Sequence, residues 1–144
     1  MISQESFHRI LYIEIGLIIA ATVILVLLIL PPSTIPQSYV NNYWLMVIIH
    51  FLSIGTLLWT IQIDKRGEER KELQVIIGVV FIVFGLIFLD HAFAFQNRPE
   101  QPPRISFGLF VCVGCDLAAG LLILVGRYFR RNRAPIRVDK SILN

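Results

Sequence analysis

Four long apolar segments dominate this chain of 144 residues. They run from about residue 10 to 30, 43 to 63, 73 to 95 and 105 to 126, and each reaches the roughly 20 apolar residues that an α-helix needs to cross a bilayer. Hydrophobic residues make up 56% of the sequence and charged residues 16%, which leaves too few polar side chains to cover a water-soluble domain. The sequence therefore predicts an all-α integral membrane protein.

The connectors between the apolar segments are short, from Pro31 to Asn42, from Asp64 to Glu72 and from Gln96 to Arg104. Short connectors place consecutive helices side by side and in opposite directions. The first and third connectors are rich in proline, so we expect them to be stiff and extended. We predict one membrane domain, residues 1–144, folded as an antiparallel up-down bundle of four transmembrane helices. The first segment is too long for a secretory signal, so we expect an uncleaved anchor.

Lysine and arginine residues fall mostly on one side of this topology, and only Arg98 and Arg104 fall on the other. Positively charged short loops resist translocation, so we expect both termini and the connector at 64–72 to be cytoplasmic. The membrane we expect is the plasma membrane of a prokaryote. The residues on the cytoplasmic side are Arg9, Lys65, Arg66, Arg70, Lys71, Arg127, Arg130, Arg131, Arg133, Arg137 and Lys140.

The basic tail, residues 127–144, contributes to a formal net charge of +3. Because it follows an apolar span directly, it fits a stop-transfer flank better than a nucleic-acid-binding segment, and we expect no nucleic-acid partner. The same charges can contact anionic lipid headgroups. The sequence contains no phosphate-binding glycine loop, nucleophile elbow or zinc-protease helix motif. A soluble active site is therefore not expected.

Four ionisable residues, His50, Asp90, His91 and Asp116, fall inside the apolar segments, in the half nearer the outer face. An ionisable group at the centre of a bilayer costs about 2.5 to 3.5 kcal/mol, so such residues usually face the interior of a bundle. We expect Asp116 to point inward, because it lies on a stripe of small residues that permits close packing of a neighbouring helix. The other members of the stripe are Gly108, Cys112, Cys115, Ala119 and Gly120.

Three interpretations of the four ionisable residues stay open. The first and favoured one is a structural polar lock, in which Asp116 is neutral or paired with His50 and fixes helix register, while Asp90 and His91 add polar contacts or Asp90 reaches Arg98 or Arg104. The second is a cofactor site, with His50 and His91 as axial ligands of haem b, or His50, His91 and Asp116 as ligands of a transition metal. The third is proton or ion passage, for which the inner half offers few polar groups.

Glu14 lies four residues inside the cytoplasmic edge of the first span. At this depth a long acidic side chain can reach water at the headgroup region, or pair with Arg127 or Arg130 at the inner end of the fourth span. We therefore expect Glu14 to lie at the surface, outside the polar cluster.

Cys112 and Cys115 have the Cys-x-x-Cys spacing of thiol–disulfide proteins. In the fourth helix of a four-helix bundle this motif resembles the quinone-reducing site of the vitamin K epoxide reductase family, although the resemblance covers only the motif and the number of spans. That family also has a shuttle pair of cysteines in its first outer loop, and residues 31–42 contain no cysteine. Disulfide exchange needs such a partner, so we interpret both cysteines as small packing residues.

The sequence favours a small integral membrane subunit that scaffolds or seals a larger multi-subunit membrane complex, an energy-transducing or oxidative one. The reasons are a chain almost wholly within the membrane, minimal loops and a sparse polar cluster. Its partners would be the lipid bilayer and other membrane subunits, and its role would be that of a non-catalytic subunit of a membrane enzyme complex. Two alternatives remain, a redox carrier that binds haem b or a metal and a homo-oligomeric channel or transporter for ions or protons.

Overall fold

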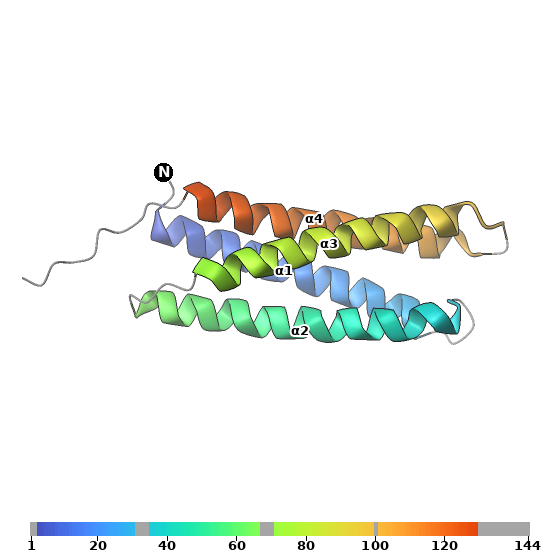
Figure 1. Ribbon diagram of the computed structural model, residues 1–144, viewed down its shortest axis with the longest axis horizontal. Coiled ribbons are helices and arrows are strands. Elements are labelled where there is room, and N and C mark those ends of the chain that lie inside the picture. The colour runs from blue at the N-terminus through green and yellow to red at the C-terminus, as the bar shows by residue number, and fades with distance from the viewer. Residues whose placement is uncertain (1–2, 31–34, 67–70, 100, 130–144) are drawn as a thin grey trace, which may run out of the picture.

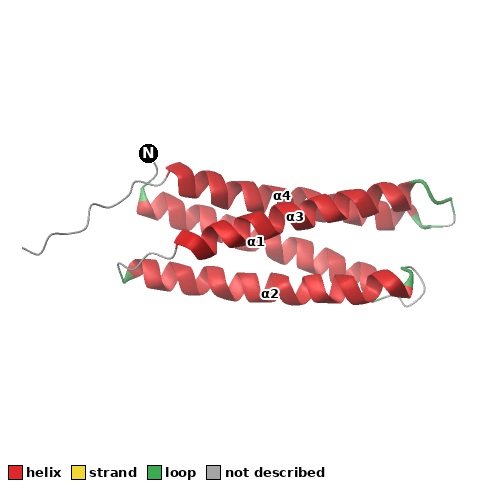
Figure 2. Cartoon of the chain, in the orientation of Figure 1, coloured by secondary structure: helices red, strands yellow, loops and turns green. Residues whose placement is uncertain are grey.

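The computed structural model describes residues 3–30, 35–66, 71–99 and 101–129, and all regular structure in these ranges is helical. The helices are α1 (Gln4–Ile29), α2 (Gln37–Lys65), α3 (Lys71–Gln96) and α4 (Pro103–Phe129), shown in Figures 1 and 2. All four are long and apolar enough to cross a membrane. The prediction of an all-α protein with four membrane-spanning segments is confirmed to this extent.

Each helix extends beyond the apolar segment that predicted it. The side chain of Ser3 caps α1 by accepting a hydrogen bond of 3.1 Å from the backbone N–H of Ser6. Pro36 precedes α2 and Pro103 begins α4, at positions where a missing N–H costs no helical hydrogen bond. Part of the predicted connectors is helical instead, and this expectation is wrong for residues 37–42, 64–65, 71–72, 96 and 103–104. Polar residues there continue a helix whose apolar face is already packed. Residues 35–36, 66, 97–99 and 101–102 of the predicted connectors are not helical, whereas residues 31–34, 67–70 and 100, and the tail from residue 130, lie outside the described residues.

The helices lie side by side along one axis, and the connecting segments gather at the two ends (Figures 1 and 2). In Figure 1, α1 and α3 begin at the end where α2 and α4 finish, which we call the N-terminal end of the bundle. Helix α4 packs closely against both α1 and α3, whereas α2 lies against α1 and approaches the backbone of α3 at few points. The bundle therefore has a tight α1–α4–α3 side and a wider gap beside α2.

Glycine permits the close approach of α3 and α4. A Cβ atom built on Gly120 would lie 2.7 Å from the carbonyl oxygen of Gly78 and 3.0 Å from the backbone nitrogen of Ile82. These contacts are with backbone, which cannot move aside as a flexible side chain can. Gly85 makes a similar approach to Leu117, where a Cβ would lie 2.5 Å from the Cγ atom. Small residues at an interface allow this packing between membrane helices.

Aromatic rings fill the wider gap between α2 and α3. The ring centroids of Tyr43 and Phe88 are 6.0 Å apart, and those of His50 and Phe84 are 5.5 Å apart. Phe81 meets His50 edge-on at 5.2 Å. Large flat side chains can bridge two backbones that stand apart, and they bury much area while doing so. The core beside α2 is thus occupied by the protein's own side chains.

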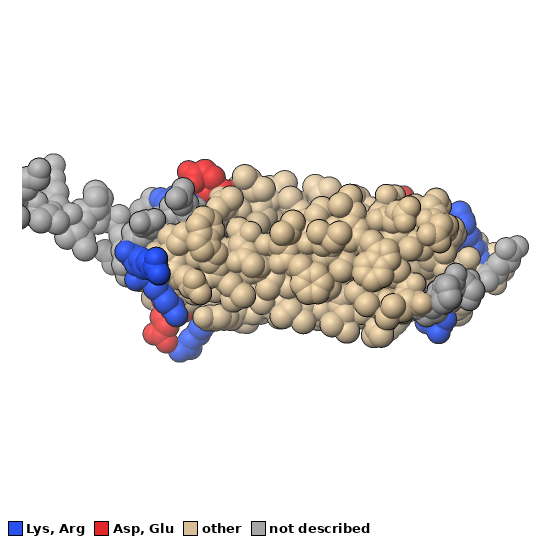
Figure 3. Space-filling model, turned by 90° about the horizontal axis from the view of Figure 1, so that it is seen from below, with Lys and Arg blue, Asp and Glu red and all other residues tan. Residues whose placement is uncertain are grey.

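The middle of the exterior is apolar. Figure 3 shows a belt without exposed Lys, Arg, Asp or Glu over most of the visible face, with charged residues at both ends of the molecule. Exposed large apolar residues occur on every helix, among them Leu27, Phe51, Leu86 and Leu121. A surface of this kind is stable when lipid tails or other apolar helices cover it.

Candidate functional site

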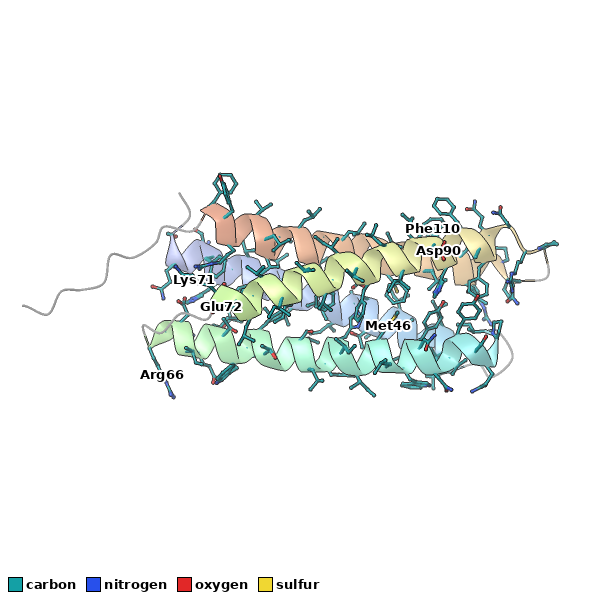
Figure 4. The ribbon with its side chains drawn as sticks, in the orientation of Figure 1. Met46, Arg66, Lys71, Glu72, Asp90 and Phe110 are labelled. Atoms are coloured by element: carbon teal, nitrogen blue, oxygen red, sulfur yellow. The ribbon has the colours of Figure 1, made fainter. Side chains whose placement is uncertain are left out.

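His50 and Asp116 meet in the core of the bundle. The Nε2 atom of His50 on α2 lies 3.3 Å from the Oδ1 atom of Asp116 on α4, and both side chains are fully buried. The other ring nitrogen of His50, Nδ1, lies 2.6 Å from the backbone carbonyl of Met46, one turn earlier in α2. Figure 4 shows Met46 on the side of α2 turned toward the other helices. The second carboxyl oxygen of Asp116, Oδ2, has no hydrogen-bond partner in the described part of the chain.

These distances place one proton on Nδ1 of His50 and a second one between Nε2 of His50 and Oδ1 of Asp116. A carbonyl oxygen only accepts, so Nδ1 of His50 carries a hydrogen and donates it to Met46. One further proton lies between Nε2 and Oδ1, either on a neutral carboxylic acid that donates to the ring or on an imidazolium that donates to a carboxylate. The pair is electrically neutral as a whole in both arrangements, which is what a buried site in lipid requires.

The surroundings of the pair exclude bulk water on the α3 side. Phe84 stacks on the His50 ring with an interplanar angle of 20°, and Phe81 meets it at 82°. Cys112, one turn before Asp116 on α4, is a weakly polar neighbour of the pair. Its thiol donates to the backbone carbonyl of Ala21 on α1 at 3.6 Å. Within such apolar walls, hydrogen bonds gain electrostatic strength and an unpaired polar group is costly.

The two cysteines are free thiols. Cys112 is buried against α1, as its bond to Ala21 shows, whereas Cys115 is half-buried. A redox role for the Cys-x-x-Cys motif requires a second pair of thiols for disulfide exchange. The sequence contains only these two cysteines, and the connector at 31–34 has none.

His91 lies apart from the His50–Asp116 pair. Its Nδ1 atom is 3.0 Å from the hydroxyl of Tyr43, and its ring meets that of Tyr39 edge-on at 5.0 Å. Along α3, His91 follows Phe84, which stacks on His50, by two helical turns, or about 10 Å of rise. Phe88 lies between these levels and packs on Tyr43.

The structure therefore does not gather the predicted metal ligands His50, His91 and Asp116. Among the residues that it describes, no three His, Cys, Asp or Glu side chains lie close enough to hold a metal ion. Between the levels of His50 and His91, Phe84 stacks on His50 and Phe88 packs on Phe84. His91 and His50 stand about two helical turns apart in level, so the three residues do not converge, and the haem site at His50 and His91 stays a prediction.

Asp90 is exposed and lies on the part of α3 away from Lys71 and Glu72 (Figure 4). In the described ranges no ion pair joins it to Arg98 or Arg104. The guanidinium of Arg98 instead lies 5.8 Å from the centre of the Phe95 ring. The predicted surface pair of Asp90 is thus absent from the described structure, and Asp90 takes no part in the contact between His50 and Asp116.

The small residues of α4 divide between two neighbours. Gly108 and Cys112 face α1, where a Cβ on Gly108 would lie 2.9 Å from Leu28. Gly120 faces α3. Ala119 is fully buried, whereas Cys115 is half-buried. The stripe of small residues spans more than one face because α4 packs against two helices at once.

Glu14 was expected at the surface, and this expectation is wrong. Its exposed fraction is 0%, and neither carboxyl oxygen has a hydrogen-bond partner in the part of the chain that the structure describes. The side chain points toward the core because Glu14 stands seven residues, close to two full turns, before Ala21, which contacts α4. The helical position decides the direction of the side chain, and its short distance from the membrane edge does not.

Two polar features at the N-terminal end of the bundle were not predicted from the sequence, the contacts of Asp64 with His8 and Gln4 and the buried side chain of Gln74. The Nε2 atom of His8 lies 2.6 Å from Oδ2 of Asp64, and the Nε2 atom of Gln4 donates to both the backbone and the side chain of Asp64 at 3.2 Å. Gln74 near the start of α3 is 1% exposed, and its amide nitrogen and oxygen are unpartnered within the described residues. The His8–Asp64 contact was recoverable, because an antiparallel pairing of the first two spans brings residues 8 and 64 to the same end.

The chain was compared with protein families, curated proteins and solved structures. No protein family matches the chain, and no curated protein and no solved structure matches it. The function is therefore inferred from the chain's own residues.

Proposed function

We propose that the chain is a small integral membrane subunit that scaffolds or seals a larger multi-subunit membrane complex, an energy-transducing or oxidative one. The observation that carries the proposal is the neutral, buried His50–Asp116 contact, which joins α2 to α4 across the bundle. A contact that is closed on the α3 side by Phe81 and Phe84 fits a residue pair that fixes helix register. The pair supports a lock better than it supports a redox carrier.

In this proposal the four helices cross the bilayer in alternating directions, with both termini in the cytoplasm of a prokaryote. The distribution of basic residues supports this orientation. Arg9, Lys65, Arg66, Lys71 and Arg127 belong to the N-terminal end of the bundle, and Arg98 and Arg104 belong to the opposite end. The tail beyond residue 129 would add its charges to the cytoplasmic side, where anionic lipid headgroups are an additional partner.

The apolar exterior supports a role among other membrane chains. A core of its own apolar side chains fills much of the bundle, and exposed apolar residues on its outside are available to partners.

The test is the native mass of the protein after mild detergent extraction from its own membrane. The proposal predicts that it migrates with larger membrane subunits at a constant ratio, and that this complex is lost in His50→Ala but kept in Asp90→Asn, the exposed control. A protein that migrates only alone or as copies of itself would contradict the scaffold role. A Soret band in the visible spectrum that disappears in His50→Ala would favour the carrier alternative instead.

A further inference from the structure

Glu14 is a buried acid that the scaffold role does not explain. Its side chain has an exposed fraction of 0%, and Oε1 and Oε2 both lack a partner in the described part of the chain. Polar groups inside a bilayer protein that meet no partner are costly, and a charged carboxylate without a cation is the most costly of them. The carboxyl group of Glu14 must therefore hold its proton, meet internal water, or do both.

The contacts between α1 and α4 place Glu14 within two helical turns of the level of Asp116 along the bundle axis. Cys112 on α4 touches Ala21 on α1, and Gly126 on α4 packs against Ile10. Glu14 lies between Ile10 and Ala21 along α1, and Asp116 lies between Cys112 and Gly126 along α4. Counting along the antiparallel helices from these two contacts puts Glu14 three to six residues from the level of Asp116, which is about 5 to 9 Å of rise.

Both acids present unpartnered oxygens to this stretch of the core. Asp116 uses Oδ1 toward His50 and leaves Oδ2 without a partner in the described ranges, as Glu14 leaves both of its oxygens. Water that enters this stretch of the core satisfies such oxygens by hydrogen bonding to them. The titratable groups facing the same stretch are Asp116 and Cys112 from α4 and His50 from α2, while the buried polar residue of α3 is Gln74, which does not titrate.

Further buried polar groups lie on α2 and α3 close to the N-terminal end of the bundle. Gln74 is 1% exposed, and both polar atoms of its side chain are unpartnered among the described residues. Thr60 on α2 is buried, and its hydroxyl donates to the carbonyl of Thr56, which leaves its oxygen free to accept. At the end itself lie His8 and Asp64, with side-chain exposures of 13% and 6%.

We propose that Glu14 and the His50–Asp116 pair form an internal proton-exchange site, bridged by water and supplied with protons from the N-terminal end past Gln74 and the His8–Asp64 contact. In the exchange step, the O–H bond of Glu14 breaks and its proton passes to a bridging water. That water passes one of its protons to Oδ2 of Asp116. The step is reversed when Asp116 returns the proton through the same water to the Glu14 carboxylate, and Glu14 exchanges its own proton with the N-terminal end, so no proton accumulates and no electrons move. This role is independent of the scaffold role.

The experiment is infrared spectroscopy of the full chain in lipid nanodiscs, read at the C=O stretch of protonated carboxylic acids. The proposal predicts a band that disappears in Glu14→Gln and shifts when the sample is transferred to D₂O, because water reaches the group. Asp116→Asn should move the remaining Glu14 band, since the two groups share water. Glu72→Gln is the matched control, because Glu72 is an exposed carboxylate on α3 and its loss should leave the band unchanged.

Two results would overturn the proposal. One is a carboxylic-acid band that Glu14→Gln leaves in place, and the other is a Glu14 band that stays unshifted after prolonged exposure of the wild-type protein to D₂O. The wild-type measurement also stands without a variant: if no carboxylic-acid band shifts in D₂O, water reaches neither Glu14 nor Asp116, and the proposal fails even if a substitution prevents folding. The result does not depend on whether the protein migrates with other subunits, so the exchange site and the scaffold role can fail separately.

Discussion

His50 and Asp116, which are 66 residues apart in the sequence, place Nε2 and Oδ1 3.3 Å from each other in the core. This contact ties α2, which otherwise meets α3 mainly through aromatic rings, to the tightly packed α1–α4–α3 side of the bundle. It joins the Tyr43–His91 and His8–Asp64 contacts as a directional bond that holds α2 to the other helices.

Removing one member of this pair should destabilise the protein. His50→Ala leaves the Asp116 carboxyl unpaired and opens a space between Phe81 and Phe84, so we expect a loss of about 2 to 4 kcal/mol in the free energy of unfolding. Asp116→Asn keeps a polar partner and should cost about 1 kcal/mol. Unfolding in mixed micelles of increasing SDS content measures both. Equal stability of His50→Ala and the wild type would contradict the lock.

Gly120 should not tolerate a side chain, whereas Gly16 should. A Cβ on Gly120 meets the backbone of α3, so Gly120→Ala should destabilise the protein by about 1 to 3 kcal/mol. Gly16 is the matched control, because a Cβ there meets no atom within 4 Å, and the higher helix propensity of alanine should make Gly16→Ala neutral or slightly stabilising. The same unfolding assay compares the two, and a larger loss for Gly16→Ala would show that the helix contacts are assigned wrongly.

Tyr43→Phe should remove a hydrogen bond without leaving a cavity. The phenol of Tyr43 lies 3.0 Å from Nδ1 of His91, so its loss should cost about 0.5 to 1.5 kcal/mol and change the ¹⁵N chemical shift of that nitrogen. Tyr128→Phe, at a tyrosine that is 84% exposed, is the control and should leave the His91 signal where it was. An unchanged His91 signal in Tyr43→Phe would mean that the two groups do not touch.

Glu14→Leu should stabilise the protein. The change replaces a fully buried carboxyl group, which has no partner among the described residues, by an apolar side chain of similar size, and we expect a gain of about 1 to 3 kcal/mol. Glu72→Leu, at an exposed site, should change the stability by less than about 0.5 kcal/mol. A destabilised Glu14→Leu variant would mean that the carboxyl group has a strong partner.

The four spans were predictable from sequence because lipid imposes a minimum length and hydropathy on each helix, and these are properties of single segments. The inward direction of Asp116 was predictable for a related reason, since it lies on the same helical face as Gly108 and Cys112. Both conclusions need information from one helix at a time.

The wrong predictions concern relations between helices. His91 was expected near the depth of His50, yet it lies about two helical turns away along α3, where its ring packs on Tyr39 and Tyr43. Glu14 was placed at the surface from its distance to the membrane edge, and its helical position turned it inward. Which helices are neighbours, and how each is rotated, is set by packing such as that of Gly120 on α3, which no single segment reveals.

The orientation of the helices in the membrane is tested most directly by labelling single cysteines with a membrane-impermeant maleimide. In a Cys112→Ala, Cys115→Ala background, cysteines would replace Gln37 and Arg98 at one end and Arg66 at the other, all three of them exposed. Four spans with cytoplasmic termini predict that reagent added outside the cell reaches positions 37 and 98 and reaches position 66 only after the membrane is opened. Labelling of position 66 in intact cells would contradict the orientation, and labelling of both ends from outside would contradict the four spans.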